Sequence, residues 1–96
     1  IGADYGMYNP EFKKEDLKKI GDWNTATIRF TENEVTYWLN GNKTLSFKPW
    51  TEDWERRKSE GKWKDYPNYG KSKTGLIGLQ DHGSEIWFRN IKIKEL

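Results

Sequence analysis

A short polar segment near the C-terminus holds the residues best suited to proton transfer. Gln80, Asp81 and His82 follow one another and are closed by Gly83. His82 is the single histidine of the chain, and imidazole has an ordinary pKa suited to proton transfer near neutral pH. Asp81 can orient that imidazole, and Arg89 can stabilise an anion if it faces the same cleft. The same residues also suit a tight hairpin turn, so a structural role stays open.

Aromatic side chains supply candidate surfaces for stacking a ligand. They make up 16% of the chain, which includes six tryptophans. The candidates lie in predicted strands and in one long loop: Trp38, Trp87, Trp63, Tyr66 and Tyr69. Core packing is the alternative role for these rings, because aromatic side chains bury large apolar areas. Trp50 and Trp54 are expected instead to anchor a short helix on a sheet.

Composition bounds the class of protein. With 96 residues the chain forms one small domain, and its net charge of +2 comes from interleaved acids and bases rather than from a basic stripe, so we expect no nucleic-acid partner. It has no cysteine, which excludes disulfides and thiolate zinc sites within it. No cofactor is evident, and a divalent metal would need carboxylates or ligands from elsewhere. We expect no membrane span, and no signal peptide is recognisable.

Alternating apolar residues predict a meander of three antiparallel strands over residues 23–31, 34–39 and 43–48. Asn40-Gly41 between the last two is a strong signal for a type I′ hairpin turn, since both central residues of that turn have positive φ. The pattern therefore predicts that most of the chain's centre is sheet.

The second half of the chain is predicted to hold one helix and two strands. The helix covers 50–59, with Thr51 as N-cap and Gly61 as its end. A polar aromatic loop fills 61–74, and strands follow over 75–80 and 85–96. The alternation changes phase near Arg89-Asn90, which indicates either a bulge or a strand buried on both faces. The fold class is all-β, with one short helix near 50–60.

Several motifs together resemble one known family. The run from Gly75 to Ile93, with its Gln80-Asp81-His82-Gly83 turn and its Phe88-Arg89-Asn90 strand, closely resembles the C-terminal signature of the 3-keto-disaccharide hydrolase domain family. Two earlier motifs and the aromatic loop resemble the same family: Trp23-Asn24 and Trp38-Leu39-Asn40-Gly41, then Trp63, Asp65-Tyr66-Pro67 and Tyr69-Gly70 in the loop. One departure is Tyr37, where the family often has histidine.

The resemblance implies a concanavalin-like jelly-roll sandwich of two antiparallel sheets. Residues 1–96 match its C-terminal half, and the N-terminal half is expected to lie outside them. The missing half, a partner chain or a second copy would then cover the apolar strand faces. The resemblance also implies a bacterial protein of the periplasm or the cell exterior, with a carbohydrate ligand.

The implied chemistry is cleavage of glycosides whose C3 hydroxyl has been oxidised to a ketone. The ketone acidifies the hydrogen at C2, and loss of that proton allows the C1 leaving group to depart. Catalytic roles fall to His82, Asp81 and Arg89, and substrate contacts to Gln80, Trp38, Trp87, Trp63, Tyr66 and Tyr69. Two alternatives stay open: a noncatalytic carbohydrate-binding module of the same fold, and a structural half that pairs with another chain.

Overall fold

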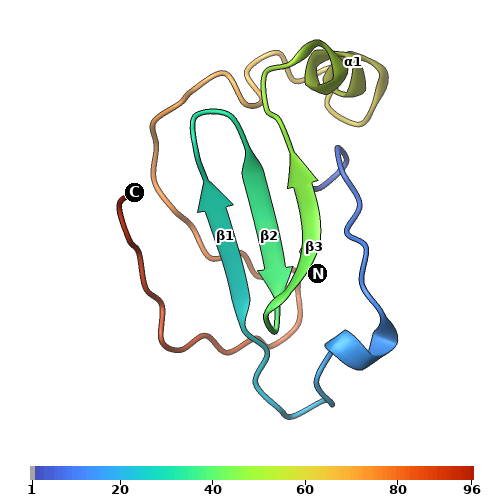
Figure 1. Ribbon diagram of the computed structural model, residues 1–96. Coiled ribbons are helices and arrows are strands. Elements are labelled where there is room, and N and C mark those ends of the chain that lie inside the picture. Colours follow the sequence, from blue (N-terminus) through green and yellow to red (C-terminus); the bar gives the residue numbers. More distant parts are fainter. Residues whose placement is uncertain (1) are drawn as a thin grey trace.

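A three-stranded antiparallel sheet is the centre of the fold. The computed structural model describes residues 2–96. Strands β1 (Ala26–Phe30), β2 (Val35–Leu39) and β3 (Asn42–Phe47) follow the order β1-β2-β3, which confirms the predicted meander (Figure 1). β1 and β2 are shorter than their predicted ranges, whereas β3 has the predicted length and lies one residue earlier, because the ladder extends only where the strands pair.

The β2–β3 hairpin forms as predicted. Leu39 pairs with Asn42, which leaves Asn40 and Gly41 as a two-residue loop. Both have positive φ, 50° and 85° respectively, as the primed turns require. The register shifts by one residue between Tyr37 and Trp38, a local irregularity within β2.

Burial is uneven across the sheet. In β2, Val35 is 1% exposed and Leu39 is 2% exposed, whereas in β1 Ile28 and Phe30 remain 63% and 54% exposed. These residues share one face, since Ile28 lies opposite Tyr37 and Phe30 lies opposite Val35. The β1 end of the apolar face is therefore uncovered in this chain.

Helix α1 (Glu52–Glu60) packs beside the end of β3, as the sequence predicts, although it begins two residues later than the predicted range. The Thr51 hydroxyl accepts from the backbone N–H of Trp54, and the N–H of Gly61 donates to the carbonyl of Arg57. Trp54 is 4% exposed and anchors the helix. Earlier in the chain, Lys14–Asp16 forms a single turn of 3₁₀ helix.

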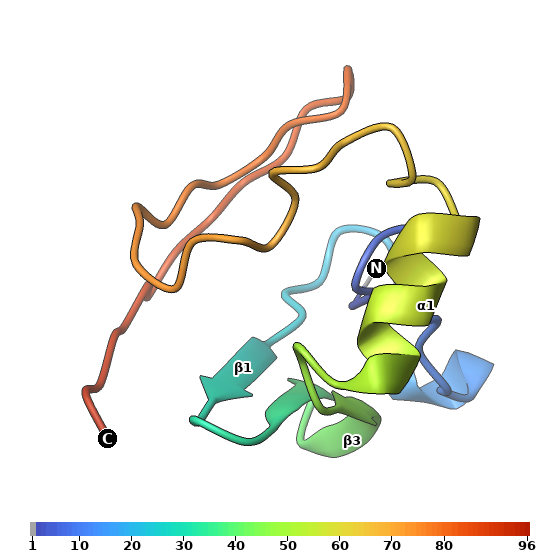
Figure 2. The same ribbon diagram turned by 90° about the horizontal axis from the view of Figure 1, so that it is seen from above.

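The strands predicted over 75–80 and 85–96 are wrong for this structure. Residues 75–96, here called the arm, form no strand, and no backbone hydrogen bond joins the arm to the sheet or to itself. Its two segments run back along each other, clear of the sheet (Figure 2). A strand is defined by its ladder of backbone hydrogen bonds, and among the described residues the arm makes none.

The second layer of the predicted sandwich is consequently not formed within residues 2–96. The arm keeps its alternating apolar residues, but they face solvent: Ile77, Trp87 and Ile93 are 75%, 70% and 76% exposed. The jelly roll therefore stays a prediction, while the all-β meander with one helix is confirmed. Among these residues, no helix has the length and apolar character to span a bilayer.

Candidate functional site

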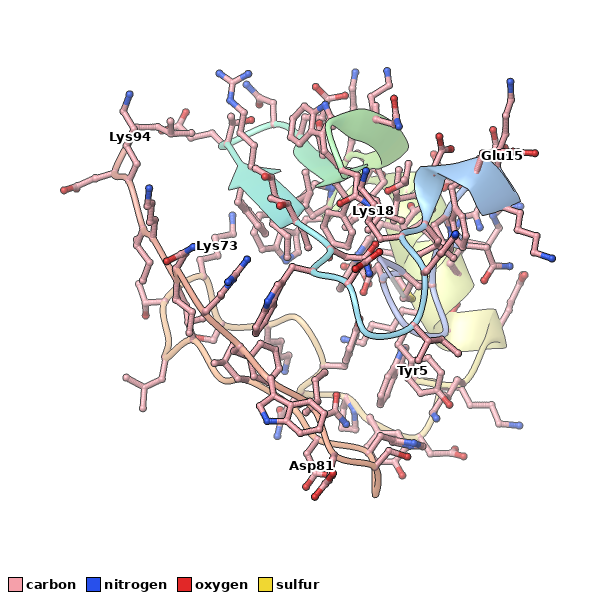
Figure 3. All side chains as sticks on the ribbon, turned by 90° about the horizontal axis from the view of Figure 1, so that it is seen from below. Tyr5, Glu15, Lys18, Lys73, Asp81 and Lys94 are labelled. Carbon is pink, nitrogen blue, oxygen red and sulfur yellow. The ribbon has the colours of Figure 1, made fainter. Side chains whose placement is uncertain are left out.

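The predicted catalytic turn lies at the far end of the arm. The N–H of Gly83 donates to Asp81 Oδ1 across 2.6 Å, so the aspartate shapes the turn itself. Gln80, Asp81 and His82 are all exposed, and the label of Asp81 in Figure 3 marks this outlying position. They line none of the three cavities described below. The structure keeps this turn apart from the aromatic loop and from Trp38.

Arg89 is placed against Trp23 rather than beside His82. Its guanidinium carbon lies 4.1 Å from the centroid of the Trp23 ring, a cation–π contact that ties the arm to the segment before β1. Trp87, two residues earlier, is largely exposed. The contact explains how Arg89 is held without assigning it a role in chemistry.

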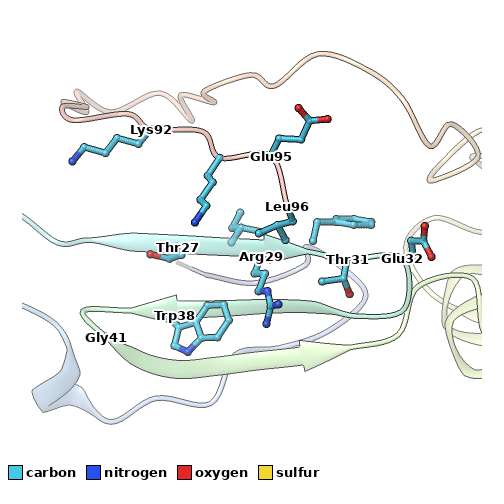
Figure 4. A pocket seen from close by; sticks show the side chains of 12 residues that line it. Thr27, Arg29, Thr31, Glu32, Trp38, Gly41, Lys92, Glu95 and Leu96 are labelled. Carbon is cyan, nitrogen blue, oxygen red and sulfur yellow. The ribbon is translucent and has the colours of Figure 1, made fainter.

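Trp38 lines the largest of the three cavities, a volume of about 980 Å³ open to solvent. The cavity lies between β1 and the C-terminal end of the arm (Figure 4). Its charged lining includes Arg29, Lys92 and Lys94. Trp38 is the one predicted substrate-binding residue there.

The aromatic rings of the 61–74 loop stack on one another. The Trp63 and Tyr69 rings lie 4.4 Å apart and nearly parallel, and Tyr69 also stacks on Trp54 at 6.1 Å. Trp63 Nε1 donates to the carbonyl of Tyr5 across 2.7 Å. Tyr66 packs edge-on against Trp63, and with Tyr69 these rings line a small pocket of about 260 Å³. The loop thus fixes the N-terminal segment as well as offering ring surface.

A second cavity, of about 580 Å³, is the best candidate functional site. It lies over the apolar face of the sheet, bounded by the N-terminal segment, the start of α1 and residues 69–76. Ring side chains form its walls: Phe30, Tyr37, Phe47, Trp50, Trp54 and Tyr69. Asp4 and Lys73 are the charged side chains that line it. Aromatic walls with a few polar groups are typical of small-molecule sites. We call it the Asp4 cavity.

Asp4 is held by a turn and by a tyrosine. The N–H groups of Met7 and Tyr8 each donate to the Asp4 carbonyl across 2.9 Å, and Met7 is buried. The Tyr69 hydroxyl donates to Asp4 Oδ1 across 2.8 Å. Burial raises the pKa of the Asp4 carboxyl above its ordinary value, and the Tyr69 hydrogen bond opposes this rise.

The N-terminal segment that carries Asp4 is clamped to α1. The Tyr8 hydroxyl donates to Asp53 Oδ2 across 3.0 Å, and Arg57 donates to the Met7 carbonyl across 3.1 Å. The Arg57 guanidinium also lies over the Tyr8 ring, 4.4 Å from its centroid. Burial raises the pKa of Tyr8 to about 12, with the Asp53 hydrogen bond as a second cause.

Tyr37 lies on β2 and faces the same cavity. Its side chain is half-buried, and burial raises the pKa of its phenol, with the negative charge of Asp4 adding to the rise. Within residues 2–96, no side-chain hydrogen bond engages its hydroxyl. The sequence singled out Tyr37 as a departure from the family pattern, but nothing in the sequence signalled Asp4.

Trp50 forms one wall in a strained backbone conformation. Its φ is 59°, unusual for a bulky residue, and its Nε1 donates to the carbonyl of Gly70 across 2.7 Å. The Lys73 ammonium lies 4.5 Å from the centroid of its ring. The ring is therefore fixed on two sides. Among the described residues, no group of three or more acidic or histidine side chains is arranged to hold a metal ion.

Comparisons with known proteins agree on one relationship. The family model described as a 3-keto-alpha-glucoside-1,2-lyase-like domain matches residues 1–94. A 3-keto-disaccharide hydrolase of Bacteroides thetaiotaomicron is 34% identical in an alignment of 92 residues, and the match covers 85% of this chain and 32% of the relative. A crystal structure from Parabacteroides distasonis, provisionally assigned as a glycosyl hydrolase, superposes with a TM-score of 0.63 at 40% identity.

Much of each relative lies outside the matched region. The superposition covers 72% of this chain and 31% of the crystallised one, so the chain spans about a third of the length of both relatives.

Proposed function

Because the chain belongs to the family of 3-keto-alpha-glucoside-1,2-lyase-like domains, we propose that the protein carrying it cleaves the glycosidic bond of sugars oxidised to a ketone at C3. The observation that carries the proposal is the match over residues 1–94, supported by the relative named as a 3-keto-disaccharide hydrolase. The proposed product pair is a free leaving group and a 3-keto sugar.

The proposed reaction begins with proton abstraction at C2 next to the ketone. It needs a base near C2, an acid near the leaving oxygen and a donor at the C3 oxygen. His82, oriented by Asp81, is our candidate for the acid, and Arg89 and Gln80 are candidates for contacts with substrate. This assignment rests on the family resemblance of their turn and strand.

The Asp4 cavity supports a carbohydrate ligand. Ring faces pack against the CH groups of a sugar, while carboxylates and phenols hydrogen-bond its hydroxyls. Of the predicted sugar-binding residues, Tyr69 lines this cavity. Trp38, Trp87, Trp63 and Tyr66 lie elsewhere, and we propose them as contacts to more distant parts of a substrate. No proposed step requires a resident cofactor.

The exposed apolar residues of β1 and the arm support a further part of the proposal. We propose that the remainder of the domain covers them and completes the sandwich, with a second copy of the chain as the alternative. The proposed location is the periplasm or exterior of a bacterial cell.

The test is a turnover assay with the full-length protein. A chromogenic aryl 3-keto-glucoside is compared with the matching aryl glucoside that carries a C3 hydroxyl. We expect release of the aryl alcohol from the first compound and not from the second. Binding of both compounds without turnover would instead favour a noncatalytic carbohydrate-binding module.

A further inference from the structure

Resting on the proposed function, we propose that Asp4 and Tyr37 work as a pair in the Asp4 cavity: the Asp4 carboxylate removes the proton at C2 of the 3-keto sugar, and the Tyr37 hydroxyl donates a hydrogen bond to the oxygen at C3. Both residues line this cavity, from the N-terminal segment and from β2. The carbon and the oxygen that they would serve belong to adjacent positions of one sugar ring.

The hydrogen bonding of the two side chains leaves one acceptor and one donor free. Tyr69 engages Oδ1 of Asp4, and no other side-chain donor among residues 2–96 engages this carboxylate. Oδ2 is therefore open to a ligand. The Tyr37 hydroxyl is likewise unengaged and half-buried. A free acceptor and a free donor in one cavity match what enolisation of a ketone demands.

The electrostatics of the cavity suit these two roles. Burial raises the pKa of the Asp4 carboxyl, which makes it a stronger base than an exposed aspartate once it is ionised. Burial and the Asp4 charge raise the pKa of the Tyr37 phenol, which keeps its proton available for donation. The proposed step uses Asp4 in its ionised form and Tyr37 as a neutral hydroxyl.

The proposed cleavage passes through an enolate of the 3-keto sugar. The C2–H bond breaks and its proton goes to Asp4; the C–H electron pair forms a C2–C3 double bond, and the carbonyl pair moves to the C3 oxygen, where Tyr37 donates. The C3 carbonyl then re-forms, a C1–C2 double bond forms, and the bond from C1 to the leaving oxygen breaks. That oxygen takes a proton from the general acid. Water then adds its hydroxide to C1 and gives its remaining proton to the general acid, as Asp4 returns a proton to C2.

The walls of the cavity favour such a ligand over bulk water. Trp50 and Trp54 present fixed rings, held by the Gly70 carbonyl in one case and by burial in the other. A sugar ring lying against them would be oriented before reaction, which is how positioned binding surfaces lower a barrier.

The experiment uses full-length protein variants Asp4→Asn, Asp4→Glu and Tyr37→Phe, with Tyr5→Phe as the matched control. Tyr5 is 65% exposed and does not line the Asp4 cavity. Two quantities are measured: steady-state kcat and KM on an aryl 3-keto-glucoside, and exchange of the C2 hydrogen with deuterium from D₂O, followed by NMR. Circular dichroism checks the fold of each variant.

We expect Asp4→Asn to lower kcat by about 10²–10⁴-fold and to abolish C2 exchange, with KM nearly unchanged. Asp4→Glu should keep part of the exchange, and Tyr37→Phe should lower kcat by about 10²–10³-fold. Tyr5→Phe should match the wild type. A folded Asp4→Asn or Tyr37→Phe protein with wild-type exchange and kcat would overturn the pairing.

A Tyr69→Phe variant keeps the test decisive if an Asp4 variant fails to fold. Since the Tyr69 hydrogen bond lowers the pKa of Asp4, its loss should move the acidic limb of the kcat/KM profile to higher pH. An unmoved limb would overturn the assignment of Asp4 as the base. Wild-type protein inactive on every 3-keto-glucoside would instead overturn the proposed function, and the inference with it.

Discussion

The side-chain amide of Asn40 donates to the side-chain carbonyl of Asn24 across 2.8 Å. Asn40 thus does more than form the hairpin turn. Its Nδ2 also donates to the Asp16 carbonyl across 2.7 Å, and its Oδ1 accepts from the N–H of Thr25 across 2.8 Å. Asn24 in turn accepts from the N–H of Lys18. Two motifs that resemble the family signature are therefore joined in one hydrogen-bond network, which fixes the N-terminal 3₁₀ turn to the sheet.

This network predicts that Asn40→Ala destabilises the protein by about 2–4 kcal/mol, because the hydrogen bonds are lost and because alanine tolerates positive φ less well than asparagine. Asn40→Gly should cost about 1–2 kcal/mol less, because glycine accepts that φ. Urea unfolding of the full-length protein measures both. Equal losses for the two variants would contradict a conformational role for Asn40.

Gly70 is predicted to be intolerant of a side chain. Its φ is 65°, and a Cβ would lie 2.6 Å from ring atoms of Trp54. We expect Gly70→Ala to destabilise by about 1–3 kcal/mol, as overpacking does. Gly78→Ala is the control, because nothing lies within 4 Å of its Cβ position. Thermal unfolding should separate the two variants, and equal melting temperatures would contradict the packing described around Trp54.

Stability should depend on pH through Asp4. Because its pKa is raised in the folded state, the folded protein holds this proton more tightly than the unfolded chain does. The resulting stability is fully present below the unfolded value near pH 3.8 and is lost as pH rises through the folded value. Asp4→Asn removes this dependence.

The measurement for Asp4 is the difference in unfolding free energy between Asp4→Asn and wild type across pH. Relative to its value below pH 3.8, this difference should move in favour of the variant as pH rises toward neutrality. A difference that does not change with pH, or that changes in the opposite direction, would show that burial does not govern the pKa of the Asp4 carboxyl.

His82 gives a prediction that depends on the family resemblance. In the full-length enzyme, His82→Ala should lower kcat by about 10²-fold or more, the usual size for loss of a general acid or base. The assay is steady-state turnover of an aryl 3-keto-glucoside, with circular dichroism as the check on folding. A folded variant with wild-type turnover would remove His82 from the mechanism.

The exposed apolar residues predict that the 96-residue chain, expressed alone, self-associates. Ile28, Phe30 and Leu76 are more than half exposed, together with most apolar residues of the arm. Contiguous exposed apolar surface is a protein-interaction feature. Sedimentation velocity should show dimers or larger species. A stable, cooperatively unfolding monomer would contradict this expectation.

Local patterns predicted the parts of the fold that have local partners. Each of β1, β2 and β3 pairs with a strand that is its neighbour in the sequence. Thr51 and Gly61 bound α1 through contacts within one turn. The arm has the same alternation but forms no ladder among the described residues, so the pattern alone could not place it. Alternation shows which residues would form an apolar face of a strand, but it does not show which other segment covers that face.

The Asp4 cavity could not be read from the sequence for a related reason. The hydrogen bond from Tyr69 to Asp4 joins residues 65 positions apart, and Tyr37 reaches the same cavity from the middle of a strand. None of these residues forms a motif by spacing. The conspicuous Gln80-Asp81-His82 sequence, in contrast, reaches no cavity within this chain.

Residues 72–76 form one wall of the Asp4 cavity, and the last two of them are the first residues of the arm. Whatever anchors the arm therefore also sets the position of that wall. If docking of the arm tightens ligand binding by some factor, the ligand must strengthen docking by the same factor, since linked equilibria are reciprocal. Completion of the domain and binding of its sugar would then be two parts of a single cooperative transition.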